Sequence, residues 1–103
     1  MIVQLRIYTI KEGLMDEWLE YFQTKLAPLS NEFGISVLRG WVSRETNEFV
    51  WMRGFDGPES VEAQELAYYN SPGRRALGDE PIELYIDNID VRVIEPVFDY
   101  TSE

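Results

Sequence analysis

Four segments of the chain are rich in β-branched and aromatic residues, and in the first of them apolar and polar residues alternate with a period of two, which is typical of β-strands. These segments are 2–10, 35–44, 48–55 and 89–97. Glu45, Thr46 and Asn47 separate the second segment from the third and form a turn, so these two segments are predicted to pair as a hairpin.

Between the strands the apolar spacing changes to three and four residues, which predicts amphipathic helices. The first helix carries Leu14, Trp18, Phe22, Leu26 and Leu29. Pro28 is expected to kink its last turns, because proline has no amide hydrogen to donate, and Gly34 to end it. A second helix is expected to open at Asp56–Glu59 and to run to about Tyr69, and Ser71 to cap a short helix. Residues 80–88 fit either a helical turn or extended chain.

The predicted order is strand, helix, strand, strand, helix, strand. Right-handed crossovers between these elements give a ferredoxin-like α+β unit, in which a four-stranded antiparallel sheet carries both helices on one face. The chain has 103 residues, which is the length of one domain. We therefore expect a single domain over residues 1–97 and a C-terminal tail over 98–103.

The two sides of the predicted strands differ in chemistry. One side is small and aliphatic, and we expect it to lie under the helices; it consists of Val3, Leu5, Ile7, Leu38, Gly40, Val42, Val50, Met52, Gly54, Val91 and Val93. The other side carries large rings and arginines; it consists of Gln4, Arg6, Tyr8, Val37, Arg39, Trp41, Phe49, Trp51, Arg53, Phe55, Asp90, Arg92 and Ile94. It has too many rings for a solvated surface and too many charges for a dry core. A second copy of the chain, packed sheet to sheet, would enclose the rings and the charged groups in a partly open chamber. We therefore expect a homodimer with a ring-lined chamber.

Charge and composition exclude several classes of function. The formal net charge is −10, which disfavours binding to nucleic acid or to anionic membranes. Cysteine and histidine are both absent, which removes disulfides, thiol nucleophiles, thiolate zinc sites and a Ser-His-Asp triad. No segment of the sequence is long and apolar enough to span a bilayer, and we expect no signal peptide, because no basic start followed by a long apolar stretch occurs. We expect a cytoplasmic protein with no metal and no cofactor.

The ring-bearing side supplies candidate ligand-binding residues. Arg6, Arg39 and Arg53 are suited to a carboxylate, a phosphate or an enolate, because guanidinium groups form paired hydrogen bonds with such anions. The apolar part of a ligand would stack on Trp41, Phe49 and Trp51. Alternatively, the arginines form ion pairs across a dimer interface.

Tyr8 and Asp90 are the candidate catalytic residues, because without histidine any proton transfer must use carboxylates, tyrosine or lysine. Tyr8 is either a proton donor or acceptor beside Arg6, or a core tyrosine. Asp90 is either a base or the ion partner of Arg92 or Arg6. Arg74 either pairs with the acidic second half of the chain or serves as a cationic lid over an anionic ligand.

The chain resembles the NIPSNAP family over nearly its whole length. The resemblance rests on Leu5-Arg6-Ile7-Tyr8, Gly13, Trp18, Leu26-Ala27-Pro28, the segment 48–55, and Tyr68-Tyr69-Asn70-Ser71-Pro72. It implies a dimeric α+β barrel built from two ferredoxin-like units, and it implies that Tyr85 lies near the mouth of the barrel.

The function expected from these observations is a homodimer that binds a small anionic, aromatic organic ligand in a cavity between sheet and helices. One alternative is a small cofactor-independent enzyme, of isomerase, cyclase or monooxygenase type, that acts on an aromatic or polyketide-like acid. The other is a structural or interaction module whose barrel is filled by side chains.

Overall fold

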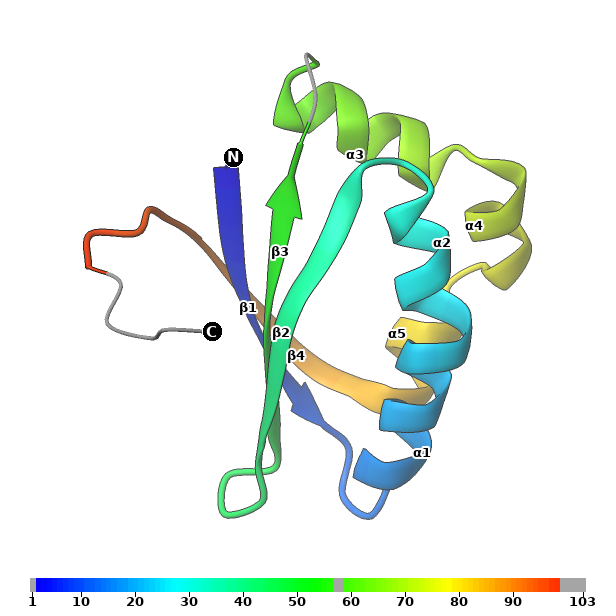
Figure 1. Cartoon of the computed structure of the whole chain (residues 1–103). Helices are drawn as coiled ribbons and strands as arrows, with labels where there is room; N and C mark the ends of the chain where they lie inside the picture. Colours follow the sequence, from blue (N-terminus) through cyan, green and yellow to red (C-terminus); the bar gives the residue numbers. More distant parts are fainter. Residues whose placement is uncertain (1, 57–58, 99–103) are drawn as a thin grey trace.

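A computed structural model describes residues 2–56 and 59–98, except for the side chains of residues 80 and 81. The elements follow the predicted order; they are β1 (Ile2–Ile10), α1 (Met15–Tyr21), η1 (Phe22–Leu26), α2 (Ala27–Asn31), β2 (Ile35–Ser43), β3 (Glu48–Phe55), α3 (Val61–Tyr69), α4 (Pro72–Leu77), α5 (Glu80–Tyr85) and β4 (Ile86–Ile94). The four strands form an antiparallel sheet in the order β2-β3-β1-β4. Figure 1 shows all the helices on one face of this sheet and the other face uncovered. The α+β fold and the four-stranded antiparallel sheet are thus confirmed.

The prediction of which face lies under the helices was wrong. Every second residue of β1 is buried from Gln4 to Ile10, and Arg6 and Tyr8 are among them. The partners of Tyr8 and Arg6 on β3 are Phe49 and Trp51, so these side chains share the helix-covered face. The large rings lie there because Trp18 of α1 and Phe22 of η1 interlock with them in one core cluster. The small aliphatic side chains of β1 and β3 lie on the uncovered face instead, whereas Val42 and Val91 lie opposite Phe49 and Arg6 and so were placed correctly on the helix-covered face.

The first helical stretch contains one wide turn. Pro28 has no amide hydrogen to donate to the carbonyl of Thr24, and the preceding turn relaxes to π-helical geometry over Phe22–Leu26. There the amide of Ala27 donates to the carbonyl of Phe22, five residues back. Gly34, with φ of 75°, follows the end of α2 in the left-handed conformation that glycine adopts without strain. The expected kink at Pro28 therefore takes the form of a π-helical segment.

The second helix begins later than predicted. The side chain of Ser60 accepts a hydrogen bond from the amide of Ala63 at 3.1 Å, so Ser60 rather than Asp56–Glu59 is the cap. Residues 57 and 58 of the predicted opening lie outside the described residues. Ser71 caps α4 as predicted, by accepting from the amide of Arg74 at 3.2 Å.

An irregularity in β2 changes which side chains share a face, and the last strand differs from the predicted one in its bounds. The pairing of β2 with β3 shifts between Val37 and Arg39, so that Gly40 rather than Arg39 lies opposite Trp51. The last strand runs over Ile86–Ile94 rather than 89–97, and the chain before it forms α5. Its register places Val91 opposite Arg6.

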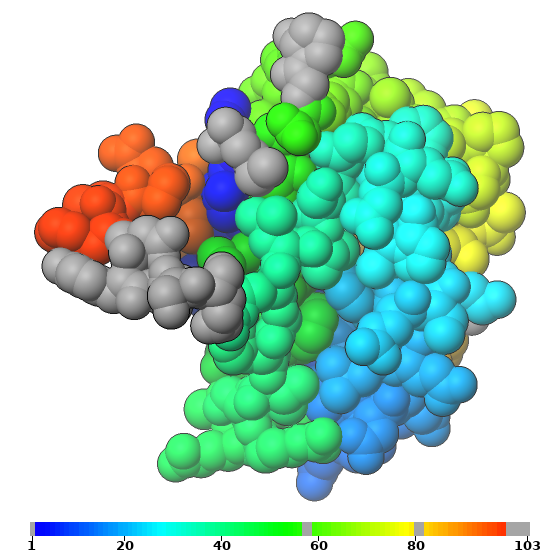
Figure 2. Space-filling model, viewed as in Figure 1, coloured from blue at the N-terminus to red at the C-terminus, as the bar shows by residue number. Residues whose placement is uncertain are grey.

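The uncovered face of the sheet carries an apolar patch, which we call the open face. It consists of the half-buried side chains of Val3, Leu5, Ile7, Val50 and Met52, with the exposed Arg39 and Trp41 at the β2 edge and Asp90 and Arg92 at the β4 edge. The segment 95–98 leaves the body of the molecule on the same side (Figures 1 and 2). None of the helices in the described part of the chain is both long and apolar enough to cross a membrane.

Candidate binding cavity under the helices

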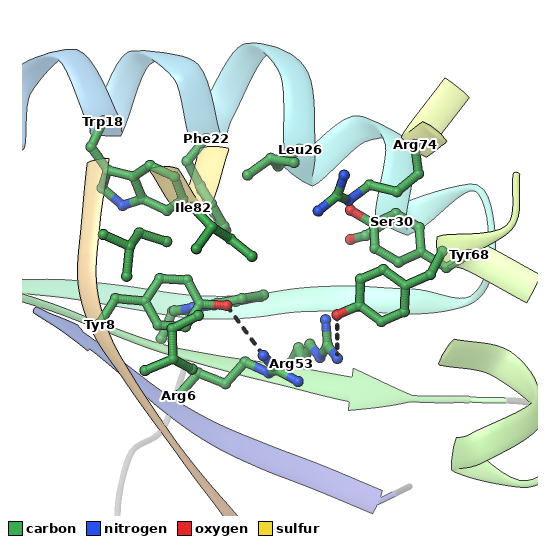
Figure 3. A pocket seen from close by; sticks show the side chains of 14 residues that line it. Arg6, Tyr8, Trp18, Phe22, Leu26, Ser30, Arg53, Tyr68, Arg74 and Ile82 are labelled. Carbon is green, nitrogen blue, oxygen red and sulfur yellow. Dashed lines mark hydrogen bonds between the residues drawn. The ribbon is translucent and has the colours of Figure 1, made fainter. Parts of the chain in front are cut away.

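The main candidate site is a cavity between the sheet and the helices. The buried apolar side chains form two clusters, one around Trp18 and the other around Ile35, Phe55 and Tyr68. The cavity has a volume of about 90 Å³ and is lined from both clusters; its wall consists of Arg6, Tyr8, Trp18, Phe22, Leu26, Ser30, Trp51, Arg53, Tyr68, Tyr69, Arg74, Ile82, Ile86 and Ile89. Figure 3 shows these side chains converging from the sheet below and from the helices above.

Two buried arginines from the central strands lie at the floor of this cavity. Only 9% of Arg6 and 3% of Arg53 is exposed. Both donate to Oε1 of Gln4 at 3.1 Å, and both form ion pairs with Oε2 of Glu65 on α3, at 3.4 Å from Arg6 and 2.5 Å from Arg53. Two buried positive charges thus share one carboxylate, and positive charge is in excess inside a chain of net charge −10.

The other half of the wall is aromatic and holds two unpaired donors. Tyr8, Trp18, Phe22 and Trp51 pack with ring centroids between 4.9 and 5.9 Å apart. The indole Nε1 atoms of Trp18 and Trp51 are buried without a hydrogen-bond partner within the described residues. A buried donor left unpaired costs about 1–3 kcal/mol. The Tyr8 hydroxyl, by contrast, accepts a hydrogen bond from Arg6 at 3.2 Å.

At the end of the cavity away from Trp18, the wall consists of two tyrosines, Tyr68 and Tyr69, and a third arginine, Arg74. The hydroxyl of Tyr69 accepts a hydrogen bond from Arg53 at 3.5 Å, and the Arg74 guanidinium lies 5.6 Å from the centre of the Tyr69 ring. Burial raises the pKa of Tyr68, while the charge of Arg74 acts in the opposite direction with a smaller effect. Tyr68 therefore remains a neutral hydroxyl at physiological pH. Among the described residues we find no group of three or more acidic side chains that could hold a metal ion.

With this geometry in place, the chain can be compared with known proteins. The family model NIPSNAP matches residues 3–99. The chain belongs to the NIPSNAP family. No protein of curated function matches this NIPSNAP chain.

Solved structures of the same fold include other NIPSNAP proteins. An uncharacterised NIPSNAP domain protein from Burkholderia xenovorans is 18% identical, with a TM-score of 0.82 and 100% of both chains covered. A NIPSNAP family protein from Agrobacterium tumefaciens is 19% identical, with a TM-score of 0.82 over 97% of this chain and 88% of that one. A candidate antibiotic biosynthesis monooxygenase from Nitrosomonas europaea is 10% identical, with a TM-score of 0.67 over 95% and 100% of the two chains. At these identities the likeness concerns the fold.

The cavity brings together four of the site residues predicted for this NIPSNAP chain: Arg6, Tyr8, Trp51 and Arg53. Arg74, considered as a cationic lid, also lies in its wall. The ion pairs of Arg6 and Arg53 are made within the chain, to Glu65, and do not require a partner chain. The roles of these residues in binding or catalysis stay predictions.

Five predicted residues lie elsewhere. Arg39 and Trp41 are on the open face, because the irregularity in β2 reverses the alternation after Val37. Asp90 is also on the open face, opposite Ile7, and pairs with Arg92 at 2.8 Å, which is the alternative considered for it. Phe49 is buried in the core beside the cavity, and Tyr85 packs on Trp18 and Tyr21 outside it.

The sequence reasoning missed the helical half of the site. Glu65, which holds both arginines, and Tyr69 are four residues apart on α3, a spacing that places them on one helix face. Trp18, Phe22, Leu26 and Ser30 also recur every four residues along the first helical stretch. These spacings were the available signals, but the spacing on the first helix was used only to predict an amphipathic helix, and that of Glu65 and Tyr69 was not used.

Proposed function

We propose that this NIPSNAP protein is a homodimer that binds a small aromatic carboxylate in the cavity under its helices. The observation that supports this most is that Arg6 and Arg53, both at least nine-tenths buried, share the single carboxylate of Glu65. A buried charge is costly unless it is paired, so this pair favours a second anion. A carboxylate suits the site because it accepts two parallel hydrogen bonds from one guanidinium.

The shape and lining of the cavity support an aromatic, small ligand. Tyr8, Phe22 and Trp51 offer ring faces and edges on which a planar group can pack. The volume of about 90 Å³ is well below the roughly 300–1,000 Å³ of pockets for drug-sized molecules. A cavity of about 150 Å³ encloses benzene, so a single-ring acid has to widen this cavity or extend through its mouth, and benzoate, the smallest aromatic carboxylate, is the first probe.

The open face supports association with a second copy. Its half-buried aliphatic centre, Leu5, Ile7 and Met52, is flanked by the exposed ring of Trp41 and by the ion pair of Arg92 with Asp90. An apolar patch with a polar margin is typical of a protein–protein interface. Sheet-to-sheet packing of two such faces would remove these side chains from water.

Ligand binding is tested by titration calorimetry with benzoate, and with benzamide as the neutral counterpart of the same shape. We expect benzoate to bind and benzamide to bind at least tenfold more weakly, because only the anion pairs with the arginines. Arg53→Gln should abolish the preference for benzoate. Arg44→Gln is the matched control, because Arg44 is 66% exposed and pairs with Asp16 away from the cavity. A filled, purely structural domain would give no heat with either compound, and this result, or equal binding of both, would refute the proposal.

Dimerisation is tested by sedimentation. We expect the wild-type chain to sediment as a dimer and Leu5→Asp, in the centre of the open face, to sediment as a monomer. Leu66→Asp is the control, because Leu66 is an exposed residue of α3 on the helical side. A wild-type chain that is monomeric at tens of micromolar would overturn this part of the proposal.

A second candidate function is a cofactor-independent enzyme that moves a proton through Tyr8. The observation in its favour is the position of the Tyr8 hydroxyl, in the cavity wall and 3.2 Å from a guanidinium nitrogen of Arg6. A hydroxyl in hydrogen-bond contact with a cation is a suitable proton donor or acceptor for an enolisable acid. Exchange of the α-hydrogens of phenylpyruvate for deuterium, followed by NMR, tests this idea. Exchange that Tyr8→Phe leaves unchanged would remove Tyr8 from the reaction.

A further inference from the structure

Arg74 is a cation of the cavity wall that has no carboxylate partner among the described residues. The ion pairs found there involve four other arginines, namely Arg6, Arg44, Arg53 and Arg92. Arg74 instead donates to the carbonyl oxygen of Gly78 at 2.8 Å, and its guanidinium lies against the ring of Tyr69. A guanidinium has five N–H donors, and Arg74 is half-buried. It therefore keeps donors for an anion in the cavity.

The hydroxyl of Tyr68 is a second available donor in the same part of the wall. Tyr68 is 4% exposed, yet its hydroxyl forms no hydrogen bond within the described residues and is not one of their fully enclosed polar atoms. Figure 3 shows Tyr68 and Arg74 both reaching into the cavity from the helical side. Among the charged groups, Arg74 has the largest effect on the pKa of Tyr68, which indicates that the two side chains are close. Burial raises this pKa, so the hydroxyl keeps a hydrogen to donate.

This part of the wall separates the cavity from an open hollow on the surface. Tyr69 and Arg74 line both the cavity and the hollow, which has a volume of about 290 Å³ and is otherwise lined by Arg75, Gly78 and Asp79. The charges of Arg75 and Asp79 offset each other, so the excess positive charge at this boundary comes from Arg74. Because the cavity of about 90 Å³ is smaller than the roughly 150 Å³ that encloses benzene, an aromatic ligand has to extend beyond it, and the hollow offers space to do so past Arg74.

We infer that the ligand is an aromatic acid with two anionic groups, one at the two arginines of the cavity floor and the other at Arg74 and Tyr68. This inference rests on the proposed function, because it adds a second charge to the same ligand. A second carboxylate has two oxygens, so Arg74 and Tyr68 can each donate to it, and a hydrogen bond to an ionised acceptor is stronger than one to a neutral acceptor. At the boundary with the hollow, this carboxylate also keeps contact with water, which avoids the cost of burying a second full charge.

The test compares isophthalate and terephthalate with their monoamides by titration calorimetry. Each monoamide keeps the shape and one carboxylate of its parent and lacks the second charge. We expect the wild-type protein to bind at least one of the two dicarboxylates about tenfold more tightly than its monoamide, which corresponds to about 1.4 kcal/mol. If neither dicarboxylate binds better than its monoamide, the inference of a second anionic group is wrong, while a preference of the same protein for benzoate over benzamide keeps the proposed function in place.

Variants locate the second charge in the structure. Arg74→Gln removes the cation and should reduce the preference for the dicarboxylate to twofold or less, and Tyr68→Phe, which keeps the ring and removes the donor, should reduce it severalfold. Arg75→Gln is the matched control and should keep the preference, because Arg75 is the next residue of α4 and lines the hollow but not the cavity. A preference that survives both Arg74→Gln and Tyr68→Phe, or that only Arg75→Gln removes, would overturn the assignment. If benzoate, the dicarboxylates and the monoamides all fail to bind, the proposed function fails and this inference with it.

Discussion

Glu65 is the residue whose replacement best tests the electrostatics of the cavity. Its Oε2 atom forms the ion pairs of both Arg6 and Arg53, which are otherwise joined through the neutral amide of Gln4. Glu65→Gln keeps the size of the side chain and removes its charge. We therefore expect two effects of opposite sign, a loss of stability and a gain in affinity for anions.

The magnitude follows from the burial of the three groups. Removing one partner of a fully buried ion pair costs about 3–5 kcal/mol, because the other charge is left uncompensated. The Glu65 side chain is 24% exposed, and glutamine still accepts a hydrogen bond, so we expect a loss of about 2 kcal/mol. A carboxylate ligand that takes the place of the lost charge can recover most of this, which makes its binding about tenfold tighter.

Urea unfolding with and without benzoate measures both effects in one experiment. The variant should have a lower unfolding midpoint alone and a larger increase on adding the acid, because a ligand that binds only the folded state raises its stability. Glu62→Gln, an exposed position of the same helix, should change neither quantity. If Glu65→Gln binds benzoate with the same or lower affinity, the arginines do not hold an anion and the reasoning is refuted.

The remaining predictions concern stability. Phe22→Ala should lower the free energy of unfolding by about 3–5 kcal/mol, because the Phe22 ring centroid lies 4.9 Å from those of both Phe49 and Trp51; a loss below 1 kcal/mol in urea unfolding would contradict this packing. Ser60→Ala should cost about 1 kcal/mol through the lost cap of α3, measured in the same way, and an unchanged midpoint would mean that the cap contributes nothing. The raised pKa of Tyr68 stabilises the fold fully below its ordinary pKa of 10.0, and this contribution is lost as the pH rises from there through the raised value. Unfolding of wild type and Tyr68→Phe from pH 8 upward should therefore diverge only above about pH 10, and parallel curves would contradict the burial of this hydroxyl.

The sequence was sufficient for the topology because period-two and helical spacings are local properties. The bounds of β1 and β3 agree with the predicted segments 2–10 and 48–55, which were set by residue composition and the neighbouring turns, and Ser71 follows from its capping chemistry. Which side of the sheet lies under the helices does not depend on local sequence. The expectation that charged residues would avoid the layer under the helices failed because Glu65, from a different element, neutralises part of the charge of Arg6 and Arg53.

The predicted site residues of the central strands β1 and β3 lie together in the structure, but those of the edge strands β2 and β4 do not join them. Arg6, Tyr8, Trp51 and Arg53 keep an unbroken alternation on β1 and β3, so they line one cavity, while their roles there stay predictions. A one-residue irregularity is enough to reverse every side chain beyond it, and this removed Arg39 and Trp41 from the site. The helical wall around Glu65 and Tyr69 depends on how the helices dock, which the spacing of residues on one helix does not specify.

The π-helical turn over Phe22–Leu26 determines how the first helical stretch meets the ligand. Residues four apart drift by about 40° per step around a regular helix of 3.6 residues per turn, so Trp18 and Ser30 would diverge by about 120°. The wider turn offsets much of this rotation, and Trp18, Phe22, Leu26 and Ser30 all reach the cavity. Deleting Gln23 would restore ordinary winding, and because the rotation lost with the residue and the rotation gained from the tighter winding nearly cancel, Leu26 and Ser30 would keep their places in the wall. The turn therefore holds one residue more than a regular helix would need, and the first helical stretch accommodates it without turning its apolar face away from the cavity.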